Sequence, residues 1–132
     1  MTALDTNVIV RFLVRDDEKQ AQLVYMRFKK AEMIGEQLWI PLAVILEVIW
    51  VLESAYGLSR HDILDSFEGM RQMPIFVFES GNVLDNLSSE GRRTRLDLSD
   101  LLIAFSAQAS GCESVLTFDK KASRHSLFEL LK

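Results

Sequence analysis

The sequence predicts an α/β fold in which a parallel sheet carries helices on both faces. Short apolar runs, typical of buried strands, alternate with longer segments of helical periodicity along the chain. Strands that alternate with helices in this way usually pair in parallel through helical crossovers. With 132 residues, of which 48% are apolar and 26% charged, the chain has the length and composition of one domain, residues 1–132.

Five apolar runs are predicted to be strands. Each run is short and ends near a charged residue, a proline or another turn signal. The runs are residues 1–4, 37–40, 75–78, 114–118 and 127–131. Because ligands of such sheets bind beyond the carboxyl ends of the strands, a site is expected where these runs end.

Five helices are predicted between these runs from their periodicity and their end signals. The expected N-terminal caps are Asp16 or Asp17, Ser59, and Asp97 or Ser99. The helices that follow these caps run towards Gly35, Pro74 and Gly111. Residues 42–56 and 81–89 form the other two, and the segment 42–56 is apolar nearly all round, which indicates a buried helix.

The chain lacks the patterns of a secreted or membrane-spanning protein. Asp5 interrupts the first apolar run, which excludes a signal-peptide core of normal length. The most apolar stretch, residues 38–52, contains Pro41 and Glu47 and is too short to span a bilayer. Cys112 is the only cysteine, so no intrachain disulfide can form. We therefore expect a soluble cytoplasmic protein with no membrane partner.

Four carboxylates stand at positions where a carboxylate is costly or structurally unusual. Asp5 ends the first predicted strand, and Asp119 follows the fourth. Glu47 lies in the middle of the apolar helix, and Asp100 precedes the apolar part of the last helix. Burying an ionised carboxylate is strongly unfavourable unless it is paired or binds a metal. The joint placement of these acids therefore predicts a cation site.

Each acid also has a purely structural interpretation. Asp5 could cap the helix that follows it. Glu47 could pair with a distant Arg or Lys, or lie on an exposed edge of its helix. Asp97 and Asp100 could interact favourably with a helix dipole, and Asp119 could be a turn residue.

An acidic cluster of this kind suits metal-assisted phosphodiester hydrolysis. Mg²⁺ and Mn²⁺ bind carboxylate and water oxygens, and they activate water and stabilise leaving oxygens. Thr6 and Asn7 could orient the carboxylates or a metal-bound water, unless they only cap the next helix. His61 and His125 lack zinc-ligand partners, and the chain has no Gly-rich phosphate loop or Gly-x-Ser-x-Gly elbow. Kinase and serine-hydrolase chemistry are therefore disfavoured.

The net charge of −4 does not argue against a nucleic-acid substrate. Without the four acids the rest of the chain is neutral, and bound divalent cations would make the site neutral or positive. Basic residues also flank the acids and could hold a phosphate backbone, or could be ordinary solvated loop charges. They are Arg92, Arg93, Arg95, Lys120, Lys121, Arg124 and His125.

At these residues the sequence resembles the PIN-domain family, and within it the VapC toxins of type II toxin–antitoxin systems. The opening Leu-Asp-Thr-Asn is similar to the family's first strand and Asp-Thr-Asn motif. Glu47 matches the second acidic position, Asp100 the third and Asp119 the fourth. Asp97 resembles an accessory acid one turn before the third. The resemblance spans residues 2–131 with the motifs in the expected order.

The resemblance implies a three-layer α/β/α sandwich with a central parallel sheet. It also implies a Mg²⁺- or Mn²⁺-dependent endoribonuclease, a homodimer, and neutralisation by a cognate antitoxin. Its implied catalytic residues are Asp5, Glu47, Asp100 and Asp119, which together with Asp97 would bind the metal. The RNA target varies widely within the family.

Two other functions remain compatible with the sequence. Haloacid-dehalogenase-like phosphatases also place a nucleophilic Asp after the first strand, but normally with a second Asp where this chain has Asn7. A non-catalytic PIN-fold module would keep the fold for protein contacts alone. A phosphorylated Asp5 would identify the phosphatase, and unchanged cellular behaviour of Asp5→Asn would identify the binding module.

Overall fold

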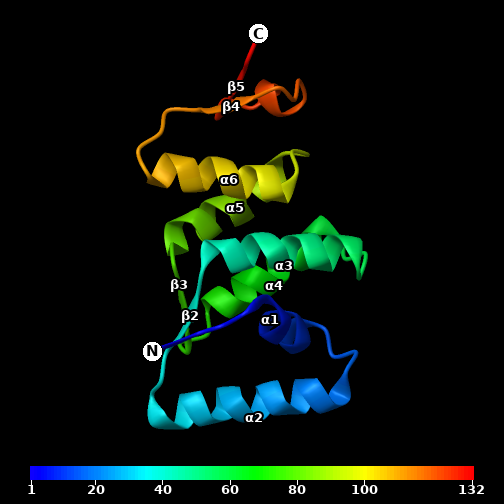
Figure 1. Cartoon of the computed structure of the whole chain (residues 1–132), viewed down its shortest axis with the longest axis vertical. Coiled ribbons are helices and arrows are strands. Elements are labelled where there is room, and N and C mark those ends of the chain that lie inside the picture. The colour runs from blue at the N-terminus through cyan, green and yellow to red at the C-terminus, as the bar shows by residue number, and fades with distance from the viewer. The chain divides into compact units, whose positions relative to one another are not determined.

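The computed structural model describes residues 1–132, which form six α-helices, one 3₁₀ helix and five short strands. Their order is β1 α1 α2 β2 α3 α4 β3 α5 α6 β4 η1 β5. The residues group into two compact units, Met1–Gly81 and Asn82–Lys132. Each unit contains its own parallel strands and its own helices (Figure 1).

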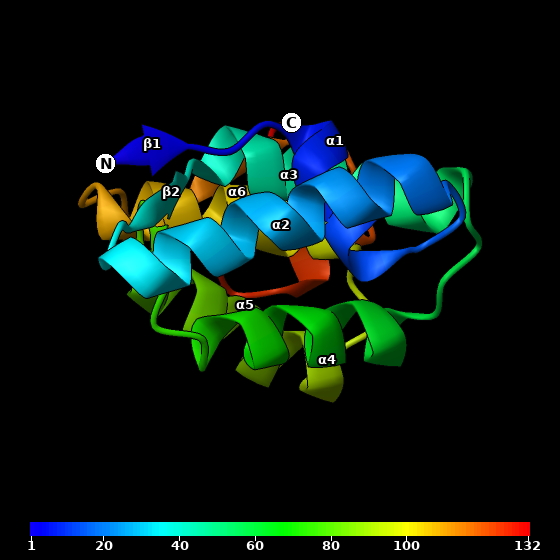
Figure 2. The same ribbon diagram turned by 90° about the horizontal axis from the view of Figure 1, so that it is seen from below.

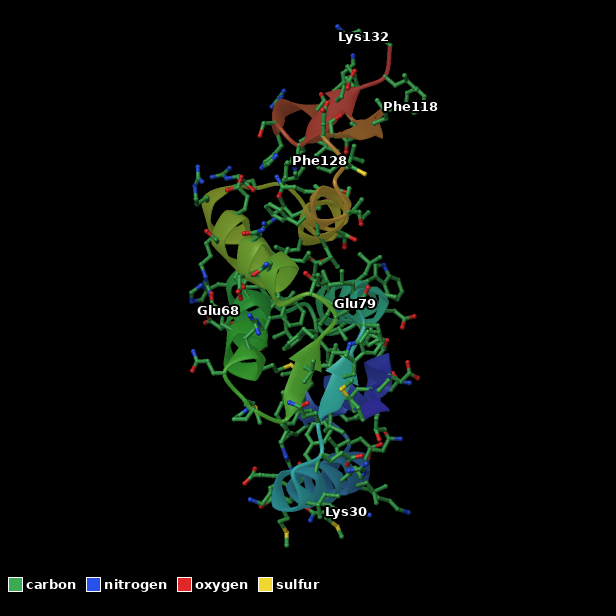
Figure 3. The ribbon with its side chains drawn as sticks, turned by 90° about the vertical axis from the view of Figure 1, so that its left-hand side faces the viewer. Lys30, Glu68, Glu79, Phe118, Phe128 and Lys132 are labelled. Atoms are coloured by element: carbon green, nitrogen blue, oxygen red, sulfur yellow. The ribbon has the colours of Figure 1, made fainter.

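The first unit contains a three-stranded parallel sheet. Its strands are β1 (Thr2–Ala3), β2 (Leu38–Ile40) and β3 (Phe76–Phe78), in the order β1-β2-β3. Leu38 lies opposite Thr2 on one side and opposite Phe76 on the other. The three strands lie side by side in Figure 3. The predicted parallel pairing is therefore confirmed in this unit.

Two pairs of helices connect the strands of this sheet. Helices α1 (Thr6–Leu13) and α2 (Glu18–Ile34) lie between β1 and β2, and α3 (Leu42–Ser54) and α4 (Arg60–Arg71) lie between β2 and β3. Helix α1 packs against α2 and α3 (Figure 2). Helix α4 packs against α3 and β3. Three phenylalanines, Phe12, Phe28 and Phe76, join α1, α2 and β3, with ring centroids 5.1 to 5.7 Å apart. The two pairs that include Phe76 are edge-to-face, a geometry that adds to the stability gained from apolar burial.

The second unit contains a two-stranded parallel sheet and two α-helices. Helix α5 (Gly81–Arg93) and helix α6 (Leu98–Ala109) precede β4 (Val115–Thr117), the 3₁₀ helix η1 (Ala122–Arg124) and β5 (Phe128–Leu130). Val115 lies opposite Phe128, and Thr117 opposite Leu130. The Phe128 side chain is buried, whereas Phe118 is 79% exposed at the outer side of the strand pair (Figure 3).

Local side-chain caps explain where several helices begin. The Asp17 carboxylate accepts a hydrogen bond from the backbone N–H of Gln20, so Asp17, and not Asp16, caps α2. Ser59 caps α4 in the same way, through the N–H of Asp62. Gly35 ends α2 with a φ of 71°, a left-handed conformation that glycine adopts without steric cost. These three predicted ends are confirmed.

Three features differ from the sequence prediction. Helix α1 was implied only by the capping interpretation of Asp5 and was given no residue range, because it is short and its apolar residues continue the first strand run. Helix α5 extends to Arg93, beyond the predicted end at Ser89, because buried Ser88 and Gly91 lie on its packed side. Helix α3 is not buried all round, since Trp50 is 65% exposed. No helix has both the length and the apolar character needed to cross a membrane.

Candidate functional site

In the first unit, a threonine connects the two predicted site carboxylates. Asp5 is the N-cap of α1, and its Oδ1 accepts a hydrogen bond of 2.8 Å from the backbone N–H of Thr6. The buried Thr6 hydroxyl donates a hydrogen bond to Oε1 of Glu47 on α3. Thr6 therefore links the end of β1 to the middle of α3. The capping role of Asp5, one of its structural interpretations, is confirmed.

Glu47 lies on an exposed stripe of α3, together with Ala43 and Trp50. The sequence argument for a buried carboxylate was therefore wrong at this position, because apolar residues on all sides of a helix do not decide which side is covered. The exposed-edge interpretation holds, whereas the proposed ion pair with a distant base does not form. Glu47 keeps one carboxylate oxygen free of hydrogen bonds from the chain.

Asn7 does not share the role of Thr6. Its side chain is exposed and makes no hydrogen bond within the chain. Of the two residues expected to orient the carboxylates, only Thr6 does so, and it contacts both Asp5 and Glu47.

In the second unit, three acids are close enough to influence one another electrostatically. Partial burial, and then the negative charges of Asp97 and Asp119, raise the pKa of Asp100 above its ordinary value. Asp97 stands at the N-cap of α6, but its side chain makes no capping hydrogen bond. A capping role therefore does not account for the Asp97 carboxylate, and the three negative charges remain uncompensated by a base.

Asp119 is held by the turn that follows β4. Its Oδ1 accepts hydrogen bonds from the backbone N–H groups of Lys121, at 2.8 Å, and Ala122, at 3.3 Å. Its own N–H donates to the hydroxyl of Thr117. The turn-residue interpretation is therefore correct, and the same turn fixes the direction of the carboxylate.

The five predicted metal-binding acids are divided between the two units. Asp5 and Glu47 belong to the first unit, and Asp97, Asp100 and Asp119 to the second. Within each unit, no three His, Cys, Asp or Glu side chains converge closely enough to hold a metal ion by themselves.

The predicted basic residues fall into two groups. One group lines a pocket of about 320 Å³ and comprises Arg95, Lys121, Arg124 and His125, whereas Arg92, Arg93 and Lys120 do not line it. Arg93 forms an ion pair of 3.2 Å with Glu90 on the same helix. The pocket is completed by Thr94 and Leu96.

Two features of this region were missed by the sequence argument. His125 Nε2 lies 2.5 Å from Oε2 of Glu90, although the two residues are 35 positions apart. The Thr94 hydroxyl is buried and has no hydrogen-bond partner. Neither feature leaves a periodic or spaced pattern in the sequence, so no signal could have revealed it.

Comparisons with known proteins identify the family of the chain. Residues 2–126 match the sequence model of the PIN domain, a segment that contains all five acids. The chain is also similar to the VapC ribonuclease of Aquifex aeolicus (strain VF5), with 26% identity over 121 residues, which is 92% of this chain and 89% of that protein. The match confirms the expected α/β sandwich, and we conclude that the chain belongs to the PIN domain family.

Proposed function

We propose that the chain is a metal-dependent endoribonuclease and the toxin of a VapBC-type toxin–antitoxin pair. The observation that carries the proposal is the family match over residues 2–126, within which all five acids lie without a basic partner. The likeness to a VapC ribonuclease over most of both chains supports RNA as the substrate. No observation favours the phosphatase alternative, because the matched family is the PIN domain.

The donor set fits Mg²⁺ or Mn²⁺. Both ions prefer carboxylate oxygens. Partial burial, and then the negative charges of Asp97 and Asp119, raise the pKa of Asp100, and a cation would offset both effects. We assign metal binding to Asp5, Glu47, Asp97, Asp100 and Asp119. These acids would hold a divalent cation, which would supply an activated water and stabilise the leaving oxygen of the phosphodiester.

The chain's own residues orient the carboxylates. Thr6 binds Glu47 through its hydroxyl and Asp5 through its backbone N–H, so one residue sets the direction of both acids. Backbone N–H groups do the same for Asp119. Hydrogen bonds of this kind keep ligands oriented and contribute to metal affinity.

Basic residues are proposed to contact the RNA backbone beside these acids. Contacts to phosphates position a nucleic acid without reading its sequence. The residues are Arg92, Arg93, Arg95, Lys120 and Lys121.

We also propose a homodimer, a cognate antitoxin as partner, and a cytoplasmic location. Four exposed apolar side chains on α2 support a protein partner, because exposed apolar patches often mark interaction surfaces. These are Leu23, Met26, Met33 and Ile34. The residues of both units are proposed to form one PIN domain, since the family match runs through both.

The first experiment tests cleavage of total cellular RNA by the purified protein in Mg²⁺ or Mn²⁺ and in EDTA. Cleavage is expected only with the metal, and it should be lost in Asp5→Asn. Glu113→Gln is the matched control, because Glu113 is an exposed acid that lies outside the proposed site and has no partner within the chain. Equal cleavage by Asp5→Asn, or in EDTA, would contradict the proposed mechanism. Intact RNA in all conditions, with growth inhibition unchanged by Asp5→Asn, would favour the binding module.

A further inference from the structure

We infer that a pocket between the end of α5 and η1 is a subsite for one phosphate group of the RNA backbone. Its six lining residues are Thr94, Arg95, Leu96, Lys121, Arg124 and His125, and its volume is about 320 Å³. The inference rests on the proposed ribonuclease function for the origin of the phosphate. The chemistry of the ligand, an oxyanion, follows from the pocket itself.

The charge of the pocket favours an anion. Arg95, Lys121 and Arg124 contribute three positive charges, and none of them forms an ion pair within the chain. No acidic residue lines the pocket. The three side chains are exposed, and cationic side chains around one site attract phosphate because their potentials add.

Glu90, a carboxylate near this region, is already engaged elsewhere. Its Oε2 contacts Nε2 of His125 at 2.5 Å, and its Oε1 pairs with Arg93 at 3.2 Å. The pocket cations are therefore left without an internal counter-ion.

Thr94 adds a neutral hydrogen-bond donor to the pocket. Its hydroxyl oxygen is buried and has no partner within the chain, which is unfavourable unless another group satisfies it. A hydroxyl group and arginine side chains are common donors to phosphate oxygens in proteins that bind nucleic acids. An oxyanion in the pocket would neutralise the three cations, and rotation of the Thr94 side chain would bring its buried hydroxyl to the same ligand.

His125 positions the turn that carries two of these cations. Its Nδ1 accepts a hydrogen bond of 3.2 Å from the N–H of Leu127, which places the ring proton on Nε2, where it is donated to Glu90. Both ring nitrogens are therefore occupied. We assign His125 a positioning role, joining η1 to α5, and not a role in binding phosphate.

The chain segments that form the pocket lead directly into the proposed metal-binding acids. Leu96 is followed by Asp97, and Asp119 holds the backbone N–H of Lys121. A phosphate bound here would therefore lie close to the acids of this unit. The subsite would keep the RNA strand in a fixed position relative to these acids.

The test measures binding of a short single-stranded RNA to Asp5→Asn protein in EDTA, across a range of KCl concentrations. Arg124→Gln and Lys121→Gln should weaken binding several-fold. Loss of one phosphate contact should also reduce the slope of log K against log salt concentration by about 0.7. Lys30→Gln is the matched control, because Lys30 is an exposed lysine on α2 (Figure 3), and it should change neither quantity.

Variants of Thr94 separate the hydroxyl group from the charges. Thr94→Val should weaken RNA binding with little change in salt dependence, and Thr94→Ser should restore the affinity. In NMR spectra, inorganic phosphate should shift the amide signals of Thr94, Arg95 and Arg124, and it should compete with the RNA.

The outcomes distinguish the subsite from the ribonuclease itself. Wild-type affinity and salt dependence in Arg124→Gln and Lys121→Gln, with phosphate-induced shifts elsewhere, would overturn the subsite even if the protein cleaves RNA. Loss of affinity in these variants would support the subsite even if wild-type protein cleaves no RNA.

Discussion

At the scale of single residues, Thr6 is the residue of the candidate site whose replacement should have the most specific effect. It is buried, lies between two acids, and donates its hydroxyl to a carboxylate 41 residues away. Hydrogen bonds to an ionised acceptor are stronger than those between neutral groups. The direction of the Glu47 carboxylate therefore depends on one small side chain.

Replacing Thr6 by valine should impair activity more than folding. Valine keeps the shape but removes the donor, so we expect roughly a 10- to 100-fold loss of metal affinity or cleavage rate, as for other residues that orient ligands. The loss of stability should be about 1 kcal/mol. Cleavage measured against Mg²⁺ concentration, together with thermal unfolding, tests this. Thr6→Ser retains the hydroxyl and should behave nearly as wild type; an equally inactive serine variant would count against the proposed role.

Asp100 should destabilise the metal-free protein at neutral pH. Its pKa is raised in the folded state, first by partial burial and then by two negative charges, so ionising Asp100 lowers the free energy of unfolding. This cost is absent below the ordinary pKa of 3.8, grows as the pH rises above it, and is fully present above the raised pKa. Asp100→Asn should therefore raise the melting temperature in EDTA at pH 7. The difference from wild type should narrow as the pH approaches 4. Glu113→Gln should leave the melting temperature unchanged. A large fall in the melting temperature of Asp100→Asn would show that the ionised Asp100 does not destabilise the metal-free protein.

At the scale of elements, Glu36 ties α2 to β1. It follows Gly35 at the end of α2, its carboxylate lies 2.6 Å from Arg27, and it accepts a hydrogen bond from the Thr2 hydroxyl. These contacts, with the Arg27 hydrogen bond first, lower the pKa of Glu36 to about 2.

A second network joins the start of α2 to the end of α3, where the Tyr56 hydroxyl donates to Asp16 and accepts from Arg11.

The Glu36 contacts should produce a specific pH dependence of stability. Because its folded pKa is lowered, its contribution is fully present above its ordinary value of 4.5 and is lost as the pH falls towards about 2. Glu36→Gln should therefore be less stable than wild type at pH 6, and the difference should shrink between pH 4.5 and 2. Denaturant unfolding at several pH values measures it. Glu32→Gln is the control, because Glu32 forms only an exposed pair with Lys29; a difference independent of pH would exclude the ion pair as its cause.

At the scale of the whole molecule, the question is whether the two units unfold together. Both tryptophans, Trp39 and Trp50, belong to the first unit, so tryptophan fluorescence reports on that unit directly. Small single domains generally unfold in one cooperative transition. If the two units form a single PIN domain, a destabilising substitution in the second unit should shift the unfolding transition reported by these two tryptophans.

A core substitution in the second unit should therefore shift the fluorescence midpoint. Leu101 is fully buried on α6, and Leu101→Ala should cost about 2 to 5 kcal/mol. Phe67→Ala in the first unit, with a cost of about 3 to 5 kcal/mol, is the positive control. If Leu101→Ala lowers the midpoint seen by circular dichroism but leaves the tryptophan transition in place, the units unfold separately and the single-domain proposal is wrong.

Much of the local structure was predictable because it depends on residues close together in the chain. The caps at Asp17 and Ser59 and the stop at Gly35 each involve one side chain or one backbone angle within a single turn. Strand runs and helical periodicity are local patterns too, and they predicted five strands and five of the six α-helices. Helix α1 was given no residue range, because its eight residues contain too few turns to show a clear helical periodicity.

Local patterns in the sequence predicted the family, the acids proposed for the site, and the order of all strands and helices except α1 and η1. The packing of distant elements was needed to establish that Glu47 is exposed and hydrogen-bonded to Thr6, that Glu90 contacts His125, and that Thr94 and three cations line one pocket. The physical reason is distance along the chain. A local pattern reports backbone conformation and the average burial of a segment, whereas contacts between distant residues arise only when whole elements pack against one another.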